Sequence, residues 1–340
     1  MVKLDYIATE ESNEVSFNID TLAVEDMVRL MNDEDKKVAE AVSKVIPQIA
    51  EASGIIYQQL KKGGRLIYIG CGTSGRLGVL DAVECPPTFG TDPEMVQAII
   101  AGGENAFVKA KEGAEDDREA GKADLEARQF CGKDVLVGIA ASGRTPYVLG
   151  AMEYARQVEA PVIGLTCCPA SEMECLADIA IVPEPGPEII AGSTRLKSGT
   201  AEKMVLNMLS TTVMIQMGKV YGNQMVDVKA SNEKLVERAV RIVRNVTGTD
   251  GVTARETLKE CDYSAKTAIV MIMTKTDKRT AEELLNQNEG RIRAIIENTE
   301  DAEDKEDKED IKHMAYTEDM TDSEDAADTE DFDERGVLCG

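Results

Sequence analysis

The 340-residue chain has a single histidine, no tryptophan and only 4% aromatic residues. A Ser-His-Asp or Cys-His nucleophilic centre needs a histidine beside the nucleophile. The one histidine here, His313, lies in a strongly acidic segment near the C-terminus, so we expect neither mechanism. Because aromatic side chains are so few, Leu, Ile, Val, Met and Ala must fill most of the core. The 43% apolar content is enough to build one.

Positive charge and long apolar runs are also scarce. The chain carries 38 Lys and Arg against 63 Asp and Glu, a formal net charge of −25. Nucleic acids and anionic membranes both select clustered basic side chains, so this balance disfavours either partner. No apolar run reaches the roughly 18 residues of a membrane-spanning helix, and the N-terminal residues lack the apolar core of a secretory signal. We therefore expect a soluble, cytoplasmic protein.

Eight cysteines are present, but none forms a CxxC pair. A large intracellular chain is expected to keep its thiols reduced. Cys167, Cys168 and Cys175 lie close together in the sequence, yet a zinc site needs about four well-placed ligands and no histidine accompanies them. We therefore expect no metal site and no disulfide.

The acidic residues are concentrated at the C-terminal end. Residues 299–340 hold 18 Asp and Glu against 4 Lys and Arg. Such a segment cannot bury enough apolar surface to offset the entropy of ordering, so we predict that it is disordered. Pattern changes divide the rest of the chain into three parts: an N-terminal helical segment (1–53), an α/β domain (54–228) and a small helical module (229–298).

Five short apolar runs dominate the middle of the chain, at residues 66–69, 96–101, 135–140, 162–165 and 179–182. Each is rich in Val and Ile and bounded by Gly, Pro, Asp or Ser. Continuous apolarity is typical of strands buried on both faces, as in a parallel sheet. Because helical patterns separate several of the runs, we predict a doubly wound α/β fold with a five-stranded parallel sheet.

Helical spacing of apolar residues predicts a helix over residues 35–62, interrupted by Pro47, and another over 145–160. A third, over 200–221, is rich in methionine, a side chain that fills irregular gaps. We interpret that helix as core or subunit interface. Short helices are expected in the C-terminal module, at residues 234–246, 254–261, 265–274 and 281–287.

Three glycine- and hydroxyl-rich loops follow predicted strands, at residues 70–76, 141–146 and 191–200. The first two both contain Ser-Gly-Arg. In an open parallel sheet, ligands bind at the carboxyl ends of the strands, where helix N-termini present free N–H groups. We therefore expect these loops to bind one phosphate and several sugar hydroxyls without a metal ion.

The first loop also fits the GxGxxG pattern of dinucleotide-binding folds, with Gly70, Gly72 and Gly75. That fingerprint requires an acidic residue about 20 positions further on, at the end of the second strand. Here the next apolar run ends later, in Gly102-Gly103-Glu104, and the second Ser-Gly-Arg has no role in that interpretation. A Walker A loop is excluded because no Gly-Lys-Ser/Thr follows.

Two carboxylates are candidates for acid–base chemistry. Glu84 lies in DAVECPPTFG (81–90), where we expect Pro86 and Pro87 to end the preceding helix. A carboxylate held at such a rigid turn is suited to act as a general acid, although a structural role is equally compatible with the pattern. Glu115 lies in EGAEDD (112–117), a pattern that by itself favours an exposed acidic loop or a helix cap over a catalytic role.

Several longer stretches carry a family resemblance: IGCGTSGRLGVLDAVECPPTFG (69–90), KEGAEDD (111–117), ASGRTPYVLGA (141–151), GPEIIAGSTRLKSGTAEKMVLNMLST (186–211) and GKVYGNQMVDVKASNEKL (218–235). Over residues 5–298 the chain resembles the N-acetylmuramic acid 6-phosphate etherase family of the sugar isomerase (SIS) superfamily. The acidic tail departs from the family pattern, which ends near the helical module.

The resemblance implies that the lactyl ether at C3 of N-acetylmuramic acid 6-phosphate is cleaved to N-acetylglucosamine 6-phosphate and D-lactate. It implies elimination of lactate followed by hydration, with no cofactor and no metal. Glu84 then protonates the departing lactate oxygen, and Glu115 is its acid–base partner. Sugar-phosphate-binding roles carry over to Thr73, Ser74, Ser142, Thr145, Ser193, Thr194 and Lys197, for which helix capping is the structural alternative.

The resemblance also identifies residues 54–228 as a SIS sugar-phosphate-binding domain and implies a homodimer with the active site near the interface. It makes the 229–298 module similar to a ubiquitin-associated (UBA-like) fold. Two other functions remain open: a SIS-type sugar-phosphate isomerase, which also needs a carboxylate base at C2, and a non-catalytic sugar-phosphate-sensing regulator. No DNA-binding helix-turn-helix or basic patch is evident, which disfavours a transcription factor.

Overall fold

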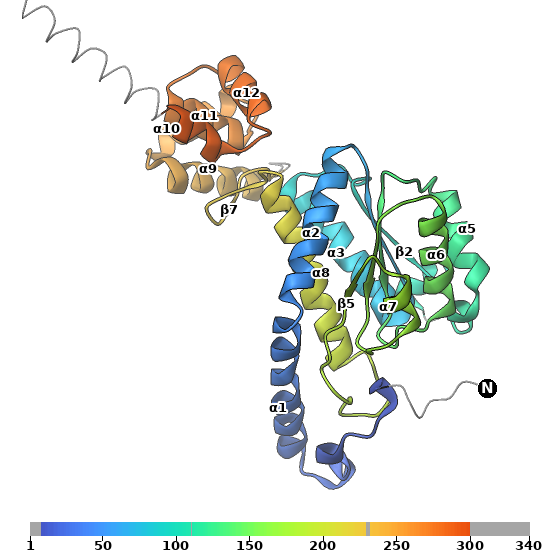
Figure 1. The fold of residues 1–340 in the computed structure, drawn as a ribbon. Coiled ribbons are helices and arrows are strands. Elements are labelled where there is room, and N and C mark those ends of the chain that lie inside the picture. Colours follow the sequence, from blue (N-terminus) through green and yellow to red (C-terminus); the bar gives the residue numbers. More distant parts are fainter. Residues whose placement is uncertain (1–7, 110, 229–231, 300–340) are drawn as a thin grey trace, which may run out of the picture.

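A five-stranded parallel sheet forms the centre of the computed structural model, which describes residues 8–109, 111–228 and 232–299 (Figure 1). The strand order is β2-β1-β3-β4-β5, and every neighbouring pair is parallel. The predicted doubly wound α/β fold is confirmed. Each of the five predicted apolar runs forms a strand: β1 (Leu66–Gly70), β2 (Val96–Ile100), β3 (Val135–Ile139), β4 (Val162–Leu165) and β5 (Ile179–Ile181). Apart from residue 299, the tail predicted to be disordered lies outside the described residues.

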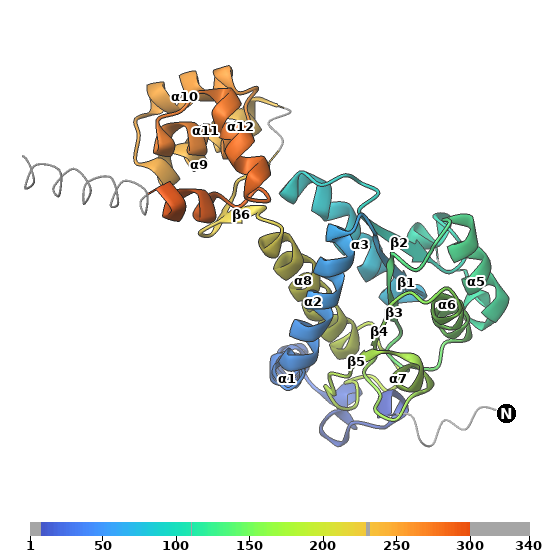
Figure 2. The same ribbon diagram turned by 45° about the horizontal axis from the view of Figure 1, so that its top comes forward.

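Helices cover both faces of the sheet (Figures 1 and 2). Side chains alternate along a strand, so Leu66 and Tyr68 of β1 join one core cluster while Ile67 and Ile69 join another. The first cluster includes residues of α1 (Val24–Ser43), α2 (Ile46–Lys61), α3 (Gly72–Phe89) and α8 (Lys197–Gln216). The second includes residues of α5 (Arg118–Ala127), α6 (Pro146–Gln157) and α7 (Glu172–Leu176). Burial on both faces explains why the strands read as continuous apolar runs.

The N-terminal part contains three short 3-10 turns, Ala8–Glu10, Glu14–Ser16 and Ile19–Thr21, followed by α1 and α2. The break that the sequence predicts near Pro47 is confirmed, because α1 ends at Ser43 and Pro47 lies in the first turn of α2. A proline is tolerated there because the first-turn N–H groups have no partner within the helix.

Two helix ends differ from the prediction. Pro86 and Pro87 do not end α3, which continues to Phe89 and stops at Gly90 in the left-handed conformation. The two prolines remove helix hydrogen bonds only in the last turn, where few remain to be lost. Similarly, α8 ends at Gln216 rather than near residue 221, because Gly218 adopts a φ of 70° and the chain then forms a hairpin of β6 (Val220–Tyr221) and β7 (Gln224–Met225).

The C-terminal helices build a separate apolar core. They are α9 (Glu233–Thr247), α10 (Gly251–Glu260), α11 (Ala265–Thr274) and α12 (Lys278–Gln287), and residues 292–299 are also helical. Asp227, just after the hairpin, pairs with Lys219 at 3.0 Å and with Lys266 of α11 at 2.7 Å. This module lies beyond the C-terminal end of α8 (Figure 1). Since an α-helix rises 1.5 Å per residue, the 20 residues of α8 separate its two ends by about 30 Å.

The remaining short elements are α4 (Asn105–Val108) and the 3-10 turn Ala114–Asp116. Within the described residues, no helix combines the length and apolarity needed to span a membrane.

Candidate active site

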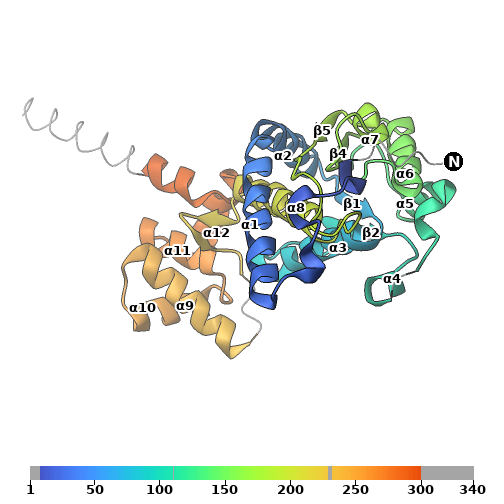
Figure 3. The ribbon, with the colours of Figure 1, turned by 90° about the horizontal axis from the view of Figure 1, so that it is seen from below.

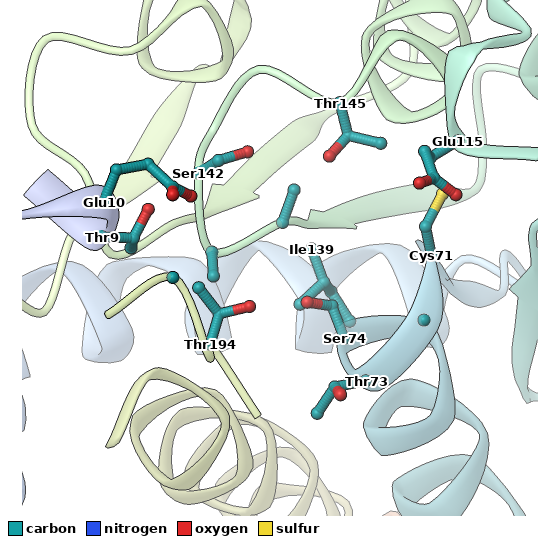
Figure 4. A pocket seen from close by; sticks show the side chains of 14 residues that line it. Thr9, Glu10, Cys71, Thr73, Ser74, Glu115, Ile139, Ser142, Thr145 and Thr194 are labelled. Carbon is teal, nitrogen blue, oxygen red and sulfur yellow. The ribbon is translucent and has the colours of Figure 1, made fainter. Parts of the chain in front are cut away.

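A cavity of about 300 Å³ opens at the carboxyl ends of β1 and β3 (Figure 4). This volume is at the lower end of the range for small-molecule sites. Hydroxyl-bearing and small residues dominate its lining, and none of the described lining residues is a lysine or an arginine. They are Thr9, Glu10, Cys71, Gly72, Thr73, Ser74, Glu115, Ile139, Ala140, Ala141, Ser142, Thr145, Gly192 and Thr194.

The first wall is the tight connection between β1 and α3. A Cβ at Gly75 would lie 2.6 Å from the carbonyl oxygen of Gly70, so only glycine lets the first turn of α3 pack against the end of the strand. Thr73 and Ser74 lie in that turn and reach the cavity. The N-cap residue, Cys71, makes no side-chain capping bond. The first N–H groups of an 18-residue helix therefore remain available to an anion, which the helix dipole also favours.

The second wall is the connection between β3 and α6. Gly143 has a φ of 66°, and a Cβ there would lie 2.4 Å from Cβ of Ser171, so the turn requires glycine. Ser142 and Thr145 flank this turn and line the cavity. Thr145 is the N-cap residue of α6, but its side chain makes no capping bond. For Thr145, helix capping by the side chain is therefore not seen in the structure, and its hydroxyl is available to bind a ligand.

The third loop contributes less than the sequence predicts. The N-terminus of α8 is already occupied, because the buried carboxylate of Glu188 accepts hydrogen bonds from the N–H groups of Lys197 and Ser198, each at 2.9 Å. Gly192 and Thr194 line the cavity, whereas Ser193 does not.

Lys197 was also expected to bind the substrate, but its side chain does not line the cavity. It is 1% exposed, and its ammonium pairs with the Glu34 carboxylate of α1 at 2.8 Å. Burial alone raises the pKa of Glu34. Hydrogen bonds from Lys197, Lys37 and Asn13 outweigh that effect and lower its pKa to about 2. A buried ion pair of this kind connects α1 to the start of α8.

Two lining residues come from the N-terminal segment, which sequence reasoning did not place at the site. The N–H of Gly192 donates to the Thr9 carbonyl at 3.1 Å, and Asn13 donates to the Pro187 carbonyl, also at 3.1 Å. These bonds bring Thr9 and Glu10 to the cavity. In Figure 3 one dark-blue turn of this segment overlies the end of β4, and the Cys168 thiol just after β4 lies 3.8 Å from the Thr9 hydroxyl oxygen. No motif marks this contact, because it depends on long-range hydrogen bonds.

Two carboxylates reach the cavity from opposite sides, Glu10 and Glu115 (Figure 4). Glu115 lies in the Ala114–Asp116 turn, and Figure 4 shows it beside Cys71. Burial, together with the charges of Glu115 and Asp116, raises the pKa of the Cys71 thiol to about 12. The thiol therefore stays protonated at neutral pH and is a poor nucleophile. Among the described residues, no group of three or more His, Cys, Asp or Glu side chains is placed to hold a metal ion.

Glu84 does not line this cavity. It is exposed on α3, and at 1.5 Å per residue the eleven positions from Thr73 place it about 16 Å further along the helix. Leu80 and Val83, near it on α3, are 42% and 58% exposed. Within one chain, Glu84 and Glu115 therefore do not meet in one site.

Comparison with protein families gives two matches. Residues 48–156 match the profile of the glucokinase regulatory protein N-terminal SIS domain, and residues 222–268 match that of the C-terminal lid domain of glucokinase regulatory protein.

Curated relatives match over a much longer stretch. N-acetylmuramic acid 6-phosphate etherase from Klebsiella aerogenes is 53% identical over 298 residues, which covers 88% of this chain and 99% of that protein. The etherase of the same name from Clostridium beijerinckii is 51% identical over 300 residues, which covers 88% of this chain and 99% of that protein. The etherase from Photorhabdus laumondii is 55% identical over 295 residues, which covers 87% of this chain and 98% of that protein.

Proposed function

The chain belongs to the N-acetylmuramic acid 6-phosphate etherase family, and on that premise we propose how its cavity carries out the reaction. The enzyme is a carbon–oxygen lyase that cleaves the D-lactyl ether of N-acetylmuramic acid 6-phosphate. Its products are N-acetylglucosamine 6-phosphate and D-lactate, so it serves the recycling of cell-wall amino sugars.

The chemistry of the substrate explains what the cavity must supply. In the open-chain sugar, C1 is an aldehyde, and the neighbouring C2 proton is acidic enough for a carboxylate to remove. The electron pair left at C2 expels lactate from C3 and leaves an unsaturated aldehyde. Lactate takes the ether oxygen with it and gains a proton, and water then adds at C3. The steps need a base, an acid and an anchor for the phosphate.

The observation that carries the proposal is the pair of uncapped helix N-termini at one cavity. Thr73 and Ser74 at α3, with Ser142 and Thr145 at α6, surround the cavity with hydroxyl groups. Neutral donors and helix dipoles together can hold a phosphate dianion where lysine and arginine are absent from the described lining. Thr194 also lines the cavity, where its hydroxyl can bind a hydroxyl group of the sugar.

Glu115 is the acid–base residue that this chain supplies to its own cavity. It sits across the cavity from Thr194 and Ser142 (Figure 4), so a sugar anchored at the helix ends extends past its carboxylate. We assign it to proton transfer at C2 or to activation of the water that adds at C3.

Glu84 serves the same reaction only if a second copy of the chain contributes it, because it lies outside the cavity of its own chain. We propose a homodimer in which α3 lies at the interface. The exposed apolar side chains of Leu80 and Val83 near Glu84 support this, as do Met208 and Ile215 on α8. Burying such side chains against a symmetric partner is favourable.

We also propose that the protein is located in the cytoplasm. The seven cysteines among the described residues are all free thiols, which suits a reducing compartment.

The direct test is to incubate the purified protein with N-acetylmuramic acid 6-phosphate and measure D-lactate. The wild-type protein should release D-lactate, and Glu115→Gln should lower kcat by about 10²–10⁴-fold. Glu112→Gln, at an exposed position three residues away, is the matched control and should leave kcat unchanged.

Assays of sugar-phosphate binding and isomerisation, run beside the lactate assay, separate the other two functions. The matches to glucokinase regulatory protein domains favour the regulator among them. Wild-type protein that binds sugar phosphates but releases no lactate and interconverts no isomers would be a sensor, and one that interconverts an aldose and a ketose phosphate would be an isomerase.

A further inference from the structure

Behind the phosphate-binding wall lies a carboxyl group that the reaction itself does not use. Glu202, in the second turn of α8, is 0% exposed, and its Oε1 lies 2.9 Å from the Ser74 hydroxyl oxygen. Ser74 in turn lines the cavity. The other oxygen of Glu202, Oε2, is buried and has no hydrogen-bond partner in the part of the chain that the structure describes. Glu202 therefore contacts the site only through Ser74.

The surroundings of Glu202 disfavour a negative charge. Burial and the charge of Glu188, in the loop before α8, together raise the pKa of Glu202 to about 8, although the Ser74 hydrogen bond lowers it. Burial also raises the pKa of the Cys167 thiol, which follows β4, so this neighbour stays protonated and neutral. At neutral pH the Glu202 carboxyl is therefore mostly protonated.

The other charged groups packed around this part of α8 give no counter-charge to Glu202. The Lys197 ammonium, one turn earlier on α8, pairs with Glu34 of α1. On α3, the Asp81 carboxyl accepts hydrogen bonds from Tyr68 and from Ser210 of α8. Burial raises the pKa of Asp81 to about 6, so Asp81 is mostly ionised at neutral pH and offers only further negative charge.

The protonation state of Glu202 decides which way the Ser74 hydrogen points. A carboxylate only accepts, so an ionised Glu202 takes the Ser74 hydrogen and leaves lone pairs facing the cavity. A protonated carboxyl donates to the Ser74 oxygen instead, and the Ser74 hydrogen can then be donated to a ligand. A phosphate anion needs that donor, since the described lining holds no lysine or arginine.

We infer that Glu202 is a positioning residue for phosphate binding: in its neutral form it donates a hydrogen bond to Ser74, which donates its own hydrogen to the phosphate of the substrate. This inference rests on the proposed function only in taking a sugar phosphate as the ligand of the cavity. Phosphate binding is then coupled to retention of the Glu202 proton, and affinity falls as pH rises through the range in which Glu202 ionises.

The test is calorimetric binding of N-acetylglucosamine 6-phosphate, the product of the reaction, between pH 7 and pH 9.5. Losing a hydrogen bond to a charged group weakens binding by about ten-fold or more, so the Kd of wild-type protein should rise by at least that factor. Glu202→Gln keeps a donor to Ser74 at every pH, and its Kd should change by less than about three-fold over the same range.

Proton uptake gives an independent readout. At pH 8.5, wild-type protein should take up protons on binding, which is detected as a dependence of the heat on the ionisation enthalpy of the buffer. Glu202→Gln should lose this uptake, and Ser74→Ala should lose it although Glu202 is intact. Asp81→Asn, the matched change of a half-buried carboxyl on the α3–α8 contact, should keep it.

Three results would overturn the inference: a flat wild-type profile, the same alkaline rise in wild-type and Glu202→Gln, or undiminished proton uptake in Ser74→Ala. None of them depends on lactate release. Conversely, wild-type protein that binds the product in the expected way but releases no lactate would contradict the proposed reaction and leave the role of Glu202 in place.

Discussion

Replacing Lys197 with methionine separates a structural role from a binding role. The resemblance to the family implied that Lys197 contacts the substrate, whereas the structure buries its ammonium against Glu34 at 2.8 Å. The pKa of Glu34 is lowered from 4.5 to about 2. At about 1.36 kcal/mol per unit, this corresponds to roughly 3 kcal/mol of stability at neutral pH. Lys197 provides the first of the hydrogen bonds that lower it, and removing one partner of a buried pair costs about 3–5 kcal/mol.

We therefore expect Lys197→Met to lose about 3 kcal/mol of unfolding free energy in urea at pH 7. KM for lactate release, measured where the variant is folded, should stay within about three-fold of wild type. Lys37 also bonds to Glu34, but its side chain is 55% exposed. Lys37→Met is thus the matched control, with an expected loss below about 1 kcal/mol.

The pH dependence has a definite sign. A lowered carboxyl pKa adds stability above the unfolded value near 4.5, and that stability is lost as pH falls toward 2. The gap between wild type and Lys197→Met should therefore shrink over this interval. A variant with unchanged unfolding free energy and a KM raised ten-fold or more would refute this reasoning and return Lys197 to the binding site.

Three further predictions concern the site and its supports. An equimolar, re-associated mixture of Glu84→Ala and Glu115→Ala should recover about a quarter of wild-type activity, because half of the dimers are mixed and each has one intact site. No recovery would mean that both residues act within one chain, and a Glu84→Ala protein that is fully active by itself would leave Glu10 to supply the acid. Ser142→Ala should raise KM about ten-fold with little change in unfolding free energy, since it removes one donor to a charged phosphate; an unchanged KM would place the phosphate elsewhere. The raised pKa of Glu202 costs stability as pH rises from about 4.5 to about 8, by up to ~1.4 kcal/mol per pH unit. Glu202→Gln should therefore be increasingly more stable than wild type over that interval, and parallel urea curves at every pH would contradict the buried, protonated carboxyl.

Local sequence was sufficient to predict the sheet and two walls of the site. Strands buried on both faces leave continuous apolar runs, and the two Ser-Gly-Arg motifs lie a few residues after β1 and β3, the first of them in the opening turn of α3. The loops that hold Thr73, Ser74, Ser142 and Thr145 were therefore located from the sequence pattern. The phosphate-binding role of these four residues came from the family resemblance and stays a prediction. Glu115 needed the family resemblance, because an acidic turn by itself reads as solvent-exposed loop.

What the sequence could not supply depends on contacts between distant segments. Glu188 occupies the N-terminus of α8, and Glu34 neutralises Lys197, so a loop that reads as a phosphate site is partly satisfied by the protein itself. Glu10 enters the cavity through a backbone hydrogen bond between residues 183 positions apart. Pro86 and Pro87 were expected to end a helix that accommodates them in its final turn.

The most direct test of the reaction is to run it in water enriched in ¹⁸O and locate the label. Elimination followed by hydration breaks the bond between C3 and the ether oxygen, so the label should appear at C3 of N-acetylglucosamine 6-phosphate and not in D-lactate. Label in the hydroxyl of lactate, with none at C3 of the sugar, would show attack at the lactyl carbon and contradict the account.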